Sequence, residues 1–302
     1  MKKKQNKLPE FFINAFYESK FRDNLFIVKA SGAVIEDDEA RASLIKNIRE
    51  LTLHGIKVVL IYGGGLAIDA ALNERGIEIK KTNGRRITDG DTIQVIREVI
   101  GGDLSLKVME TMQRNDLNGL SFNAIPANWM KVKMRPKTPV DFGYVGDIHD
   151  IYTRPVLRLL KTADFIACPC LAISDDGDLC NINADTIATA LATGLKADKL
   201  IFMSNVDGVK IDGETAMMIT SDEIPQLIEK NIVTDGMRVK MENCADALAA
   251  GVKRIHLING LRENALHCEI FESVGPGTML LKEEERESYM NEVNVQKAIG
   301  GK

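Results

Sequence analysis

The sequence has no apolar run close to the roughly 18 residues that a membrane span needs. Its basic start, MKKKQNK, lacks the apolar segment that follows such a start in a secretory signal. The five cysteines are an odd number at irregular spacing, which is typical of reduced thiols in a cytoplasmic protein. Cys168 and Cys170 form a C-x-C pair inside an apolar run, where we expect buried thiols and no metal site. We therefore expect a cytoplasmic protein that does not bind membranes.

Other absences narrow the class of function. The net charge of -4 carries no basic surplus, which argues against a general nucleic-acid binder. The motif G-x-x-x-x-G-K-[ST] is absent, so the chain is not a P-loop NTPase, and the absence of G-x-G-x-x-G argues against a nicotinamide enzyme. Only four histidines occur, and none lies in the loops described below. A chain of 302 residues can form one large α/β domain or two lobes.

Short apolar runs alternate with segments of helical spacing along most of the chain. We predict strands where the runs are β-branched, and helices where apolar residues recur every three to four positions. The predicted helices lie at 8–24, 38–54, 66–75, 89–100, 104–113, 184–197, 222–231 and 238–252, with a break at Gly101-Gly102. The predicted strands lie at 25–30, 57–62, 163–173, 198–204 and 254–260, with hairpins in 120–149 and a frayed polar helix or tail at 283–302. This alternation indicates a mainly parallel sheet covered on both faces.

Three of the predicted strands end in small or polar residues, at Lys29–Gly32, Gly63–Gly65 and Ser204–Gly208. Ligands of open parallel sheets bind beyond the carboxyl ends of the strands. Three such strand ends with small or polar residues favour a phosphate-bearing ligand. The glycine run lets backbone N–H groups approach an anion, with a helix N-terminus behind them. The alternative is a tight strand-to-helix turn with no ligand.

Five polar residues in three segments are candidates for the chemistry, and each segment has a simpler interpretation. Lys29 ends a buried strand, where its ammonium either reaches an anion or extends to solvent. Asn181, Asn183 and Asp185 precede an apolar helix, and Asn183 or Asp185 could be only an N-cap. Lys240 comes early in another helix, where an exposed lysine is the common case.

Together these segments resemble the amino acid kinase family, most closely the acetylglutamate kinases, from about Phe26 to Leu281. The segments KASG, YGGGL, GRRIT, NINAD, NVDG, DGMRVK and GTML occur in the order of the family motifs, and DFGYVGDI resembles another. The resemblance implies a three-layer αβα sandwich, with an amino-acid-binding N-lobe at 26–195 and a nucleotide-binding C-lobe at 196–282. It also implies ATP-dependent phosphorylation of the side-chain carboxylate of N-acetyl-L-glutamate in arginine biosynthesis.

The resemblance implies a role for each matching residue. Lys29 and Lys240 would contact the transferring phosphoryl group, and Asp185 would orient both lysines. The substrate would be bound by Gly63, Gly64, Gly65, Arg86 and Asn181, with Arg86 pairing with its α-carboxylate. Phosphates and nucleotide would be bound by Gly32, Ser204, Asn205, Asp207 and Gly208, and Mg²⁺ would be held through the ATP phosphates. An acceptor carboxylate with a pKa near about 4.3 is already ionised at neutral pH, so no general base is needed.

Four residues depart from the family motifs. Ser31 replaces a glycine of the lysine loop, and its side chain would be strained if its backbone had a positive φ. Tyr62 and Leu66 replace a histidine and a proline around the glycines, and Asn205 replaces an aspartate. Two alternatives therefore stay open, namely a kinase of another acyl acceptor and a non-catalytic amino-acid sensor with the same fold.

The two ends of the chain suggest regulation and assembly. Residues 1–25 resemble the extra helix through which arginine-inhibited acetylglutamate kinases assemble, so we expect a homo-oligomer, either a dimer or a hexamer. The segment HLINGLRENALHCEIFESVGPGTM resembles their arginine-binding segment, which makes Glu269, Gly275 and Gly277 a candidate effector site. However, NGL replaces the usual D-G-R there. The strand FIVKASGAVIEDD is also similar to the opening strand of bifunctional acetylglutamate synthase/kinases.

Overall fold

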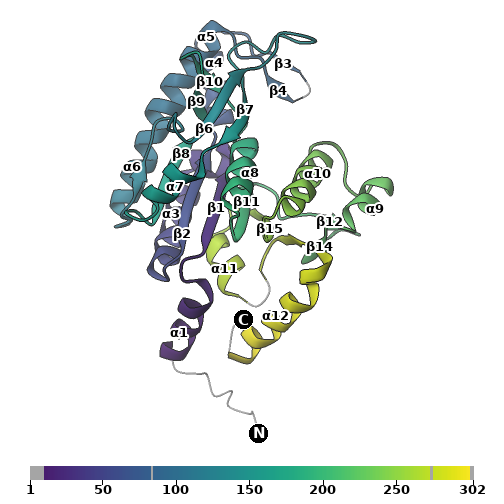
Figure 1. The fold of residues 1–302 in the computed structure, drawn as a ribbon. Helices are drawn as coiled ribbons and strands as arrows, with labels where there is room; N and C mark the ends of the chain where they lie inside the picture. Colours follow the sequence, from purple (N-terminus) through teal and green to yellow (C-terminus); the bar gives the residue numbers. More distant parts are fainter. Residues whose placement is uncertain (1–9, 83, 273–274, 300–302) are drawn as a thin grey trace.

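An eight-stranded sheet forms the centre of the computed structural model, which describes residues 10–82, 84–272 and 275–299 (Figure 1). Its strand order is β14-β16-β15-β11-β1-β2-β8-β5. The strands are β1 (Leu25–Ala30), β2 (Lys57–Tyr62), β5 (Leu120–Ser121), β8 (Phe165–Pro169), β11 (Lys199–Ser204), β14 (Met218–Thr220), β15 (Arg254–Asn259) and β16 (Thr278–Leu281). All neighbours pair in parallel except β15 and β16. The prediction of a mainly parallel sheet is confirmed.

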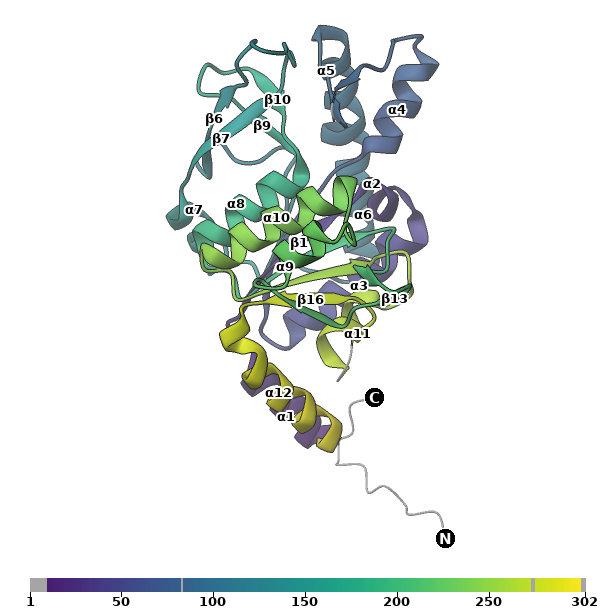
Figure 2. The same ribbon diagram turned by 90° about the vertical axis from the view of Figure 1, so that its right-hand side faces the viewer.

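Helices cover both faces of this sheet, which confirms the three-layer αβα arrangement (Figure 2). One face packs against α8 (Ala184–Leu195) and α10 (Asp235–Ala249), and the other against α3 (Asp38–Leu53), α6 (Ser105–Arg114) and α11 (Ala265–Phe271). The remaining helices are α1 (Glu10–Phe21), α2 (Gly32–Glu36), α4 (Gly65–Glu74), α5 (Gly90–Ile96), α7 (Thr153–Leu159), α9 (Ile224–Glu229), α12 (Arg286–Ile299) and the 3₁₀ turn η2 (Glu283–Glu285). No helix in the described ranges is both long and apolar enough to cross a bilayer.

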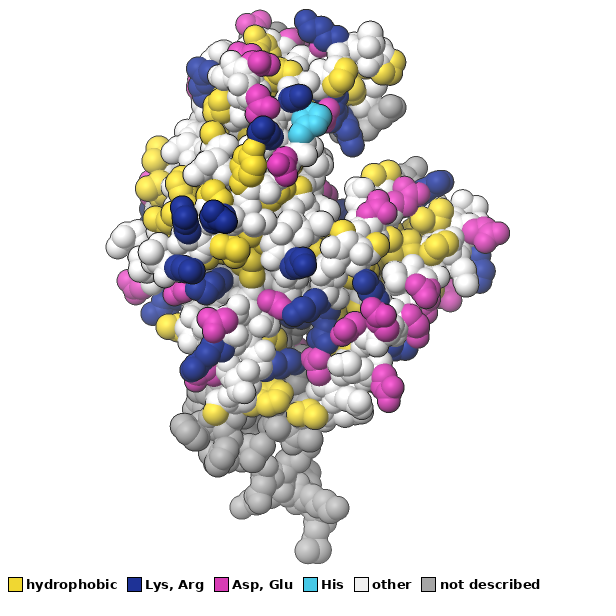
Figure 3. Space-filling view, in the orientation of Figure 1, with side chains coloured by type: hydrophobic (Ala, Val, Ile, Leu, Met, Phe, Trp, Pro, Cys, Tyr) yellow, Lys and Arg dark blue, Asp and Glu magenta, His cyan; other side chains and the backbone are white. Residues whose placement is uncertain are grey.

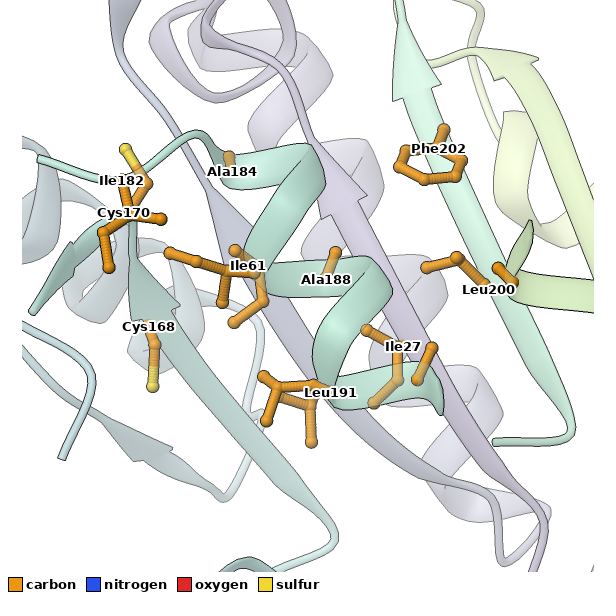
Figure 4. Packing of buried hydrophobic residues seen from close by; sticks show 14 of the residues in the cluster. Ile27, Ile61, Cys168, Cys170, Ile182, Ala184, Ala188, Leu191, Leu200 and Phe202 are labelled. Atoms are coloured by element: carbon orange, nitrogen blue, oxygen red, sulfur yellow. The ribbon is translucent and has the colours of Figure 1, made fainter. Parts of the chain in front are cut away.

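Strand periodicity decides which way Lys29 points. Successive side chains of a strand face opposite sides of the sheet. In β1, Ile27 packs on the α8 face, together with Ile61 of β2 and Leu200 of β11 (Figure 4). Lys29 is two residues beyond Ile27, so it lies on the same face at the carboxyl end of the strand. This places its side chain over the first turn of α8.

Three hairpins lie beyond the carboxyl ends of the central strands, in the upper part of Figure 1. They are β3 (Lys81–Thr82) with β4 (Arg85–Arg86), β6 (Met130–Met134) with β7 (Gly146–Ile151), and β9 (Leu171–Ile173) with β10 (Leu179–Asn181). A fourth, β12 (Lys210–Ile211) with β13 (Glu214–Thr215), follows β11. The prediction of one strand over 163–173 was wrong, because the chain leaves the central sheet after Pro169 and pairs with β10 instead.

The helix break predicted at Gly101-Gly102 is absent from the structure. Instead, α5 continues through a π-helical segment, η1 (Arg97–Leu104), directly into α6. π-helical turns often mark functional sites. Here Gly101 allows a close contact, since it lies against Leu171 and its carbonyl accepts a hydrogen bond from Asn123. The segment therefore packs tightly against the loops at the carboxyl end of the sheet.

The helices near the two ends of the chain, α1 and α12, both lie at the lower end of the molecule (Figure 2). The apolar face of α1 packs on its own subunit, because Tyr17 and Phe21 are buried and their rings contact Phe271 of α11. Lys20 of α1 forms an ion pair with Glu292 of α12 at 3.0 Å. Residues 286–299, expected as a frayed helix or tail, thus form an anchored helix.

Candidate active site

Two lysines from distant parts of the sequence converge on one carboxylate. The Nζ atom of Lys29 lies 2.8 Å from Asp185 Oδ1, and that of Lys240 lies 3.6 Å from Asp185 Oδ2. Lys29 comes from β1, Asp185 from the first turn of α8 and Lys240 from the second turn of α10. Burial alone would raise the pKa of Asp185, but the two ammonium groups outweigh it and hold the pKa below its usual value. The cluster keeps a net charge of +1, which suits an anionic ligand.

The geometry decides between the readings left open for these residues. The side chain of Lys29 is only 12% exposed and is bound to Asp185, so it does not extend to solvent. Asn183 is the N-cap of α8, because its side chain accepts the N–H of Thr186 at 3.1 Å. Capping by Asn183 leaves the carboxylate of Asp185 available for both lysines.

The glycine loop (Gly63–Gly65) contacts the lysine loop (Lys29–Gly32). A Cβ atom added at Gly32 would lie 2.9 Å from the amide nitrogen of Gly65, and one added at Gly64 would lie 2.9 Å from Leu104 of η1. The N–H of Gly63 donates to the Ala30 carbonyl at 3.4 Å, so this amide is used within the protein. Glycine is required at 32 because the backbone of Gly65 leaves no room for a Cβ, whereas a Cβ at 64 would have to displace the side chain of Leu104.

A carboxylate of the chain itself occupies the N-terminus of α4. Glu36, at the end of α2, accepts hydrogen bonds from the backbone N–H groups of Leu66 and Ala67. Burial nevertheless raises the pKa of Glu36. This carboxylate therefore binds amides of the first turn of α4, behind the glycine run, and it joins the lysine loop to the glycine loop.

The residues that depart from the family motifs fit without strain. Ser31 has φ −72° and ψ 164°, so its Cβ causes none of the strain that a positive φ would bring. Tyr62 is buried, and its hydroxyl lies 3.0 Å from the Oγ atom of Ser105, which donates to the Ile100 carbonyl of η1 at 2.8 Å. Burial raises the pKa of Tyr62. Leu66 is 62% exposed.

A cavity of about 310 Å³ opens beside the lysine cluster. The space-filling view shows the molecule hollowed between its upper end and the part that carries α10 (Figure 3). The lining of this first cavity includes Lys29, Ser31, Gly32, Gly63, Gly64, Gly65, Arg85, Arg86, Arg135, Asn181 and Asp185. Three guanidinium groups and an ammonium group around one cavity indicate an anionic ligand.

Two of the three arginines of this cavity are held by acidic partners. Arg86 Nη1 lies 2.5 Å from Asp69, and its Nη2 donates to the Gly65 carbonyl at 3.3 Å. Arg135 on β6 pairs with Asp147 on β7 at 2.6 Å. The sequence patterns did not predict Arg135. Its one signal is that its hairpin partner, Asp147, belongs to the motif DFGYVGDI.

A second cavity, of about 350 Å³, follows the carboxyl end of β11. Of the predicted nucleotide residues, Asn205, Asp207 and Gly208 line it, together with Thr234 and Met237 at the start of α10. Asp207 accepts from Asn259 at 3.0 Å and pairs with Arg262 at 2.8 Å. Ser204 ends β11, and its carbonyl accepts the N–H of Gly260.

Gly208 closes one wall of this second cavity. Its φ is +128°, and an added Cβ would lie 2.5 Å from Thr278 Oγ1. Val206 and Ile232, two other lining residues, are 43% and 37% exposed. Exposed apolar side chains in a cavity provide contacts for the flat face of a base.

A third polar cluster contains the predicted effector residues. Glu269 accepts the N–H of Gly277 at 3.1 Å and contacts Gly275 and the Nδ1 atom of His256. The other ring nitrogen of His256 lies 3.0 Å from Lys199 Nζ. The cavity that this cluster lines has a volume of only about 30 Å³. That volume is of the order of one water molecule.

We expect the folding stability to depend on pH through this third cluster. Burial lowers the pKa of Lys199 from 10.5 to about 7, and burial followed by the charge of Lys199 lowers that of His256 from 6.5 to about 4. The unfolded chain therefore binds more protons than the folded chain between pH 7 and 10.5 (Lys199) and between pH 4 and 6.5 (His256). The free energy of unfolding should rise with pH in both windows, by at most about 1.4 kcal/mol per pH unit for each group. Urea unfolding between pH 6.5 and 9.5 measures this slope. The Lys199→Met variant should lose it, and an unchanged slope would contradict the assignment.

The comparisons with known proteins agree with this geometry. The model of the amino acid kinase family matches residues 24–259. The acetylglutamate kinase of Chlorobaculum tepidum is 32% identical over 276 residues, covering 91% of this chain and 96% of that protein. The acetylglutamate kinase of Pseudothermotoga lettingae is 35% identical over 270 residues, covering 87% and 94%.

A solved structure shows the same fold. The N-acetylglutamate synthase of Neisseria gonorrhoeae, complexed with coenzyme A and N-acetyl-glutamate, matches with a TM-score of 0.81 at 24% identity. The match covers 90% of this chain but 63% of the synthase, so the chain spans less than two thirds of that protein.

A mainly parallel sheet with a cationic cavity and a second cavity at its carboxyl end defines an α/β protein that binds small anionic ligands. The extent of the sequence matches makes the family certain. The chain belongs to the amino acid kinase family.

Proposed function

We propose that this protein transfers the γ-phosphoryl group of ATP to the side-chain carboxylate of N-acetyl-L-glutamate, a step of arginine biosynthesis. The observation that carries the proposal is the cluster of Lys29, Asp185 and Lys240. Lys29 and Asp185 line the first cavity, and Lys240 belongs to the helix whose start lines the second. The acceptor binds in the first cavity and the nucleotide in the second, so the two lysines stand where the phosphoryl group must pass.

The chemistry requires charge neutralisation and positioning. The acceptor carboxylate is ionised at neutral pH and attacks phosphorus without a base. Lys29 and Lys240 neutralise the phosphoryl oxygens, and Asp185 keeps both ammonium groups aimed at the same point. The amides of Gly32, Gly64 and Gly65 are the backbone donors for the phosphoryl group and acceptor.

Mg²⁺ reaches this site with the nucleotide. The described part of the chain brings no three His, Cys, Asp or Glu side chains together as a metal site. Asp185 already pairs with two lysines, and Asp207 with Arg262. The ATP phosphates hold the ion, as is usual for Mg²⁺.

Arg86 binds the α-carboxylate of the acceptor in this proposal. Its guanidinium is fixed by Asp69 and by the Gly65 carbonyl at the rim of the first cavity. We expect Arg86→Ala to raise KM for N-acetylglutamate by about 10- to 100-fold while KM for ATP is unchanged, because a charged hydrogen bond contributes about 1.5–3 kcal/mol. Steady-state kinetics with each substrate varied measures this. Arg75→Ala, which removes an exposed arginine paired with Glu98, is the control. An unchanged acceptor KM would rule out this role for Arg86.

The direct test of the proposed function is acyl-phosphate formation trapped with hydroxylamine. We expect a hydroxamate signal that requires ATP, Mg²⁺ and N-acetylglutamate. A panel of related carboxylates runs alongside. Turnover of another acid alone would assign the chain to a sibling kinase. Nucleotide binding with no turnover across the panel would make it a sensor with a kinase fold.

Arginine is the proposed effector at Glu269, Gly275 and Gly277. Glu269 is the buried carboxylate that would pair with its guanidinium. The cavity of about 30 Å³ is too small for an arginine side chain, so binding requires α12 or its partners to move. Arginine titration followed by both activity and thermal shift tests the proposal, and no response in either would reject it.

A homo-oligomer in the cytoplasm completes the proposal. The buried or partly buried free thiols support a reducing compartment. Tyr17 and Phe21 pack α1 against its own subunit. A second copy of the chain would therefore contact the opposite face of α1. Light scattering of the full chain decides between monomer, dimer and hexamer.

A further inference from the structure

Ser31 carries a hydroxyl with no hydrogen-bond partner in the described structure. Its Oγ atom has almost no contact with solvent, and no described polar atom lies within hydrogen-bonding reach. A buried hydroxyl without a partner costs free energy, so each such group in a native protein needs an explanation. The residue also lines the first cavity, between Lys29 and Gly32.

The backbone of Ser31 is held at a fixed position. Its N–H donates to the Met203 carbonyl at the end of β11 at 2.9 Å. Its carbonyl accepts the N–H groups of Val34 and Ile35, both at 3.0 Å. The residue is the N-cap of α2, but its side chain makes no capping bond. The only freedom left is rotation about χ1, which carries Oγ between three staggered positions.

The surroundings define what the hydroxyl can bind. The neighbouring side chains are the ammonium of Lys29, which only donates, the carboxylate of Asp185, which forms ion pairs with two lysines, and the carboxylate of Glu36 beside Gly32. None of them forms a hydrogen bond with the Ser31 hydroxyl. The hydroxyl is therefore a spare donor in the lining of the same cavity as Lys29 and Asp185. An oxygen of a phosphoryl group is the acceptor that such a donor suits, because charge-assisted hydrogen bonds are the strongest.

We propose that the Ser31 hydroxyl donates a hydrogen bond to an oxygen of the transferring phosphoryl group and so contributes directly to catalysis. This inference rests on the proposed kinase function. In the step, the bond between the γ-phosphorus and the bridging oxygen of ATP breaks as the bond to the acceptor carboxylate forms. ADP keeps the electron pair of the broken bond. Ser31 keeps its proton throughout, so it stabilises charge without acid–base chemistry.

The test compares Ser31→Ala, Ser31→Thr and Ser31→Gly with the wild-type chain. We expect Ser31→Ala to lower kcat by 10- to 100-fold with little change in either KM, and Ser31→Thr, which keeps the hydroxyl, to recover most of it. Ser31→Gly restores the family motif and should fold well, since φ at this position suits any residue. It should be as slow as Ser31→Ala. Equal kcat in Ser31→Ala and wild type, or a faster Ser31→Gly, would overturn the proposal.

A binding measurement separates this inference from the proposed acceptor. ADP with Mg²⁺ and aluminium fluoride mimics the transferring group, and its affinity can be measured by calorimetry without turnover. We expect Ser31→Ala to weaken the mimic by at least tenfold more than it weakens ADP alone. An equal loss for both would place the hydroxyl at the nucleotide and contradict the proposal. The wild-type chain could fail to phosphorylate N-acetylglutamate while Ser31→Ala still weakens the mimic more than ADP. That result would reject N-acetylglutamate as the acceptor but support the role of the Ser31 hydroxyl.

Ser121→Ala is the matched control. Ser121 also has a buried hydroxyl without a partner, but it lies on β5, at the edge of the central sheet. Its removal should leave both kcat and the mimic affinity unchanged. A loss equal to that of Ser31→Ala would mean that any buried hydroxyl matters to the fold, which would overturn the proposal.

Discussion

Replacing Lys29 with methionine is expected to lower kcat by about 10²- to 10³-fold, the cost of removing one preorganised donor from a developing anion. Methionine keeps most of the length and apolar volume of the side chain, so β1 and α8 should pack as before. The ammonium group that neutralises the phosphoryl oxygens is lost. Asp185 also keeps only Lys240, at 3.6 Å, and becomes a less compensated negative charge beside the phosphoryl group. The hydroxamate assay with saturating ATP and N-acetylglutamate measures the change.

Lys57→Met controls for the loss of a strand lysine. Lys57 begins β2, at the opposite end of the sheet, and its ammonium donates to the Leu160 carbonyl at 2.5 Å. Its removal should change stability more than kcat. A Lys29→Met variant as active as Lys57→Met would refute the role of the lysine cluster.

Gly32→Ala is expected to reduce kcat/KM for the acceptor by about 10²-fold or more. Its Cβ would lie 2.9 Å from the Gly65 amide nitrogen and would also meet a carboxylate oxygen of Glu36. The Glu36 side chain can turn away, but the backbone of Gly65 cannot, so the lysine loop and the glycine loop must separate. A displacement of about 1 Å at a phosphoryl-transfer site costs about 10²-fold in rate. The forced packing should also lower the free energy of unfolding by about 1–3 kcal/mol.

Gly90→Ala provides the comparison for this variant. Gly90 begins α5, and a Cβ there meets nothing within 4 Å. The two variants should differ in kcat/KM for the acceptor, measured by steady-state kinetics, and in the free energy of unfolding, measured with urea. If Gly32→Ala matched Gly90→Ala, the contact between the two loops would have no importance for catalysis.

The sequence by itself determined the layers of the fold and the main catalytic candidates. Alternating apolar runs predicted the mainly parallel sheet, and the helix predicted at 38–54 is observed as α3, where Asp37 is the N-cap and accepts the N–H of Ala40. A lysine at the end of a buried strand is informative, because it must find a counter-charge. The period of two along β1 then places Lys29 on the α8 face. These are local signals, set by periodicity and by the chemistry of single residues.

Only the tertiary structure decided how those residues are used. Asn183 rather than Asp185 caps α8. Asp185 instead forms ion pairs with two lysines that lie 156 residues before it and 55 residues after it in the sequence. Glu36 fills the N-terminus of α4, which the glycine run alone left open for a ligand. Arg135 reaches the first cavity through a hairpin whose register no local pattern specifies. Each of these outcomes depends on contacts between segments far apart in the chain, and such contacts are settled by packing and charge pairing in three dimensions.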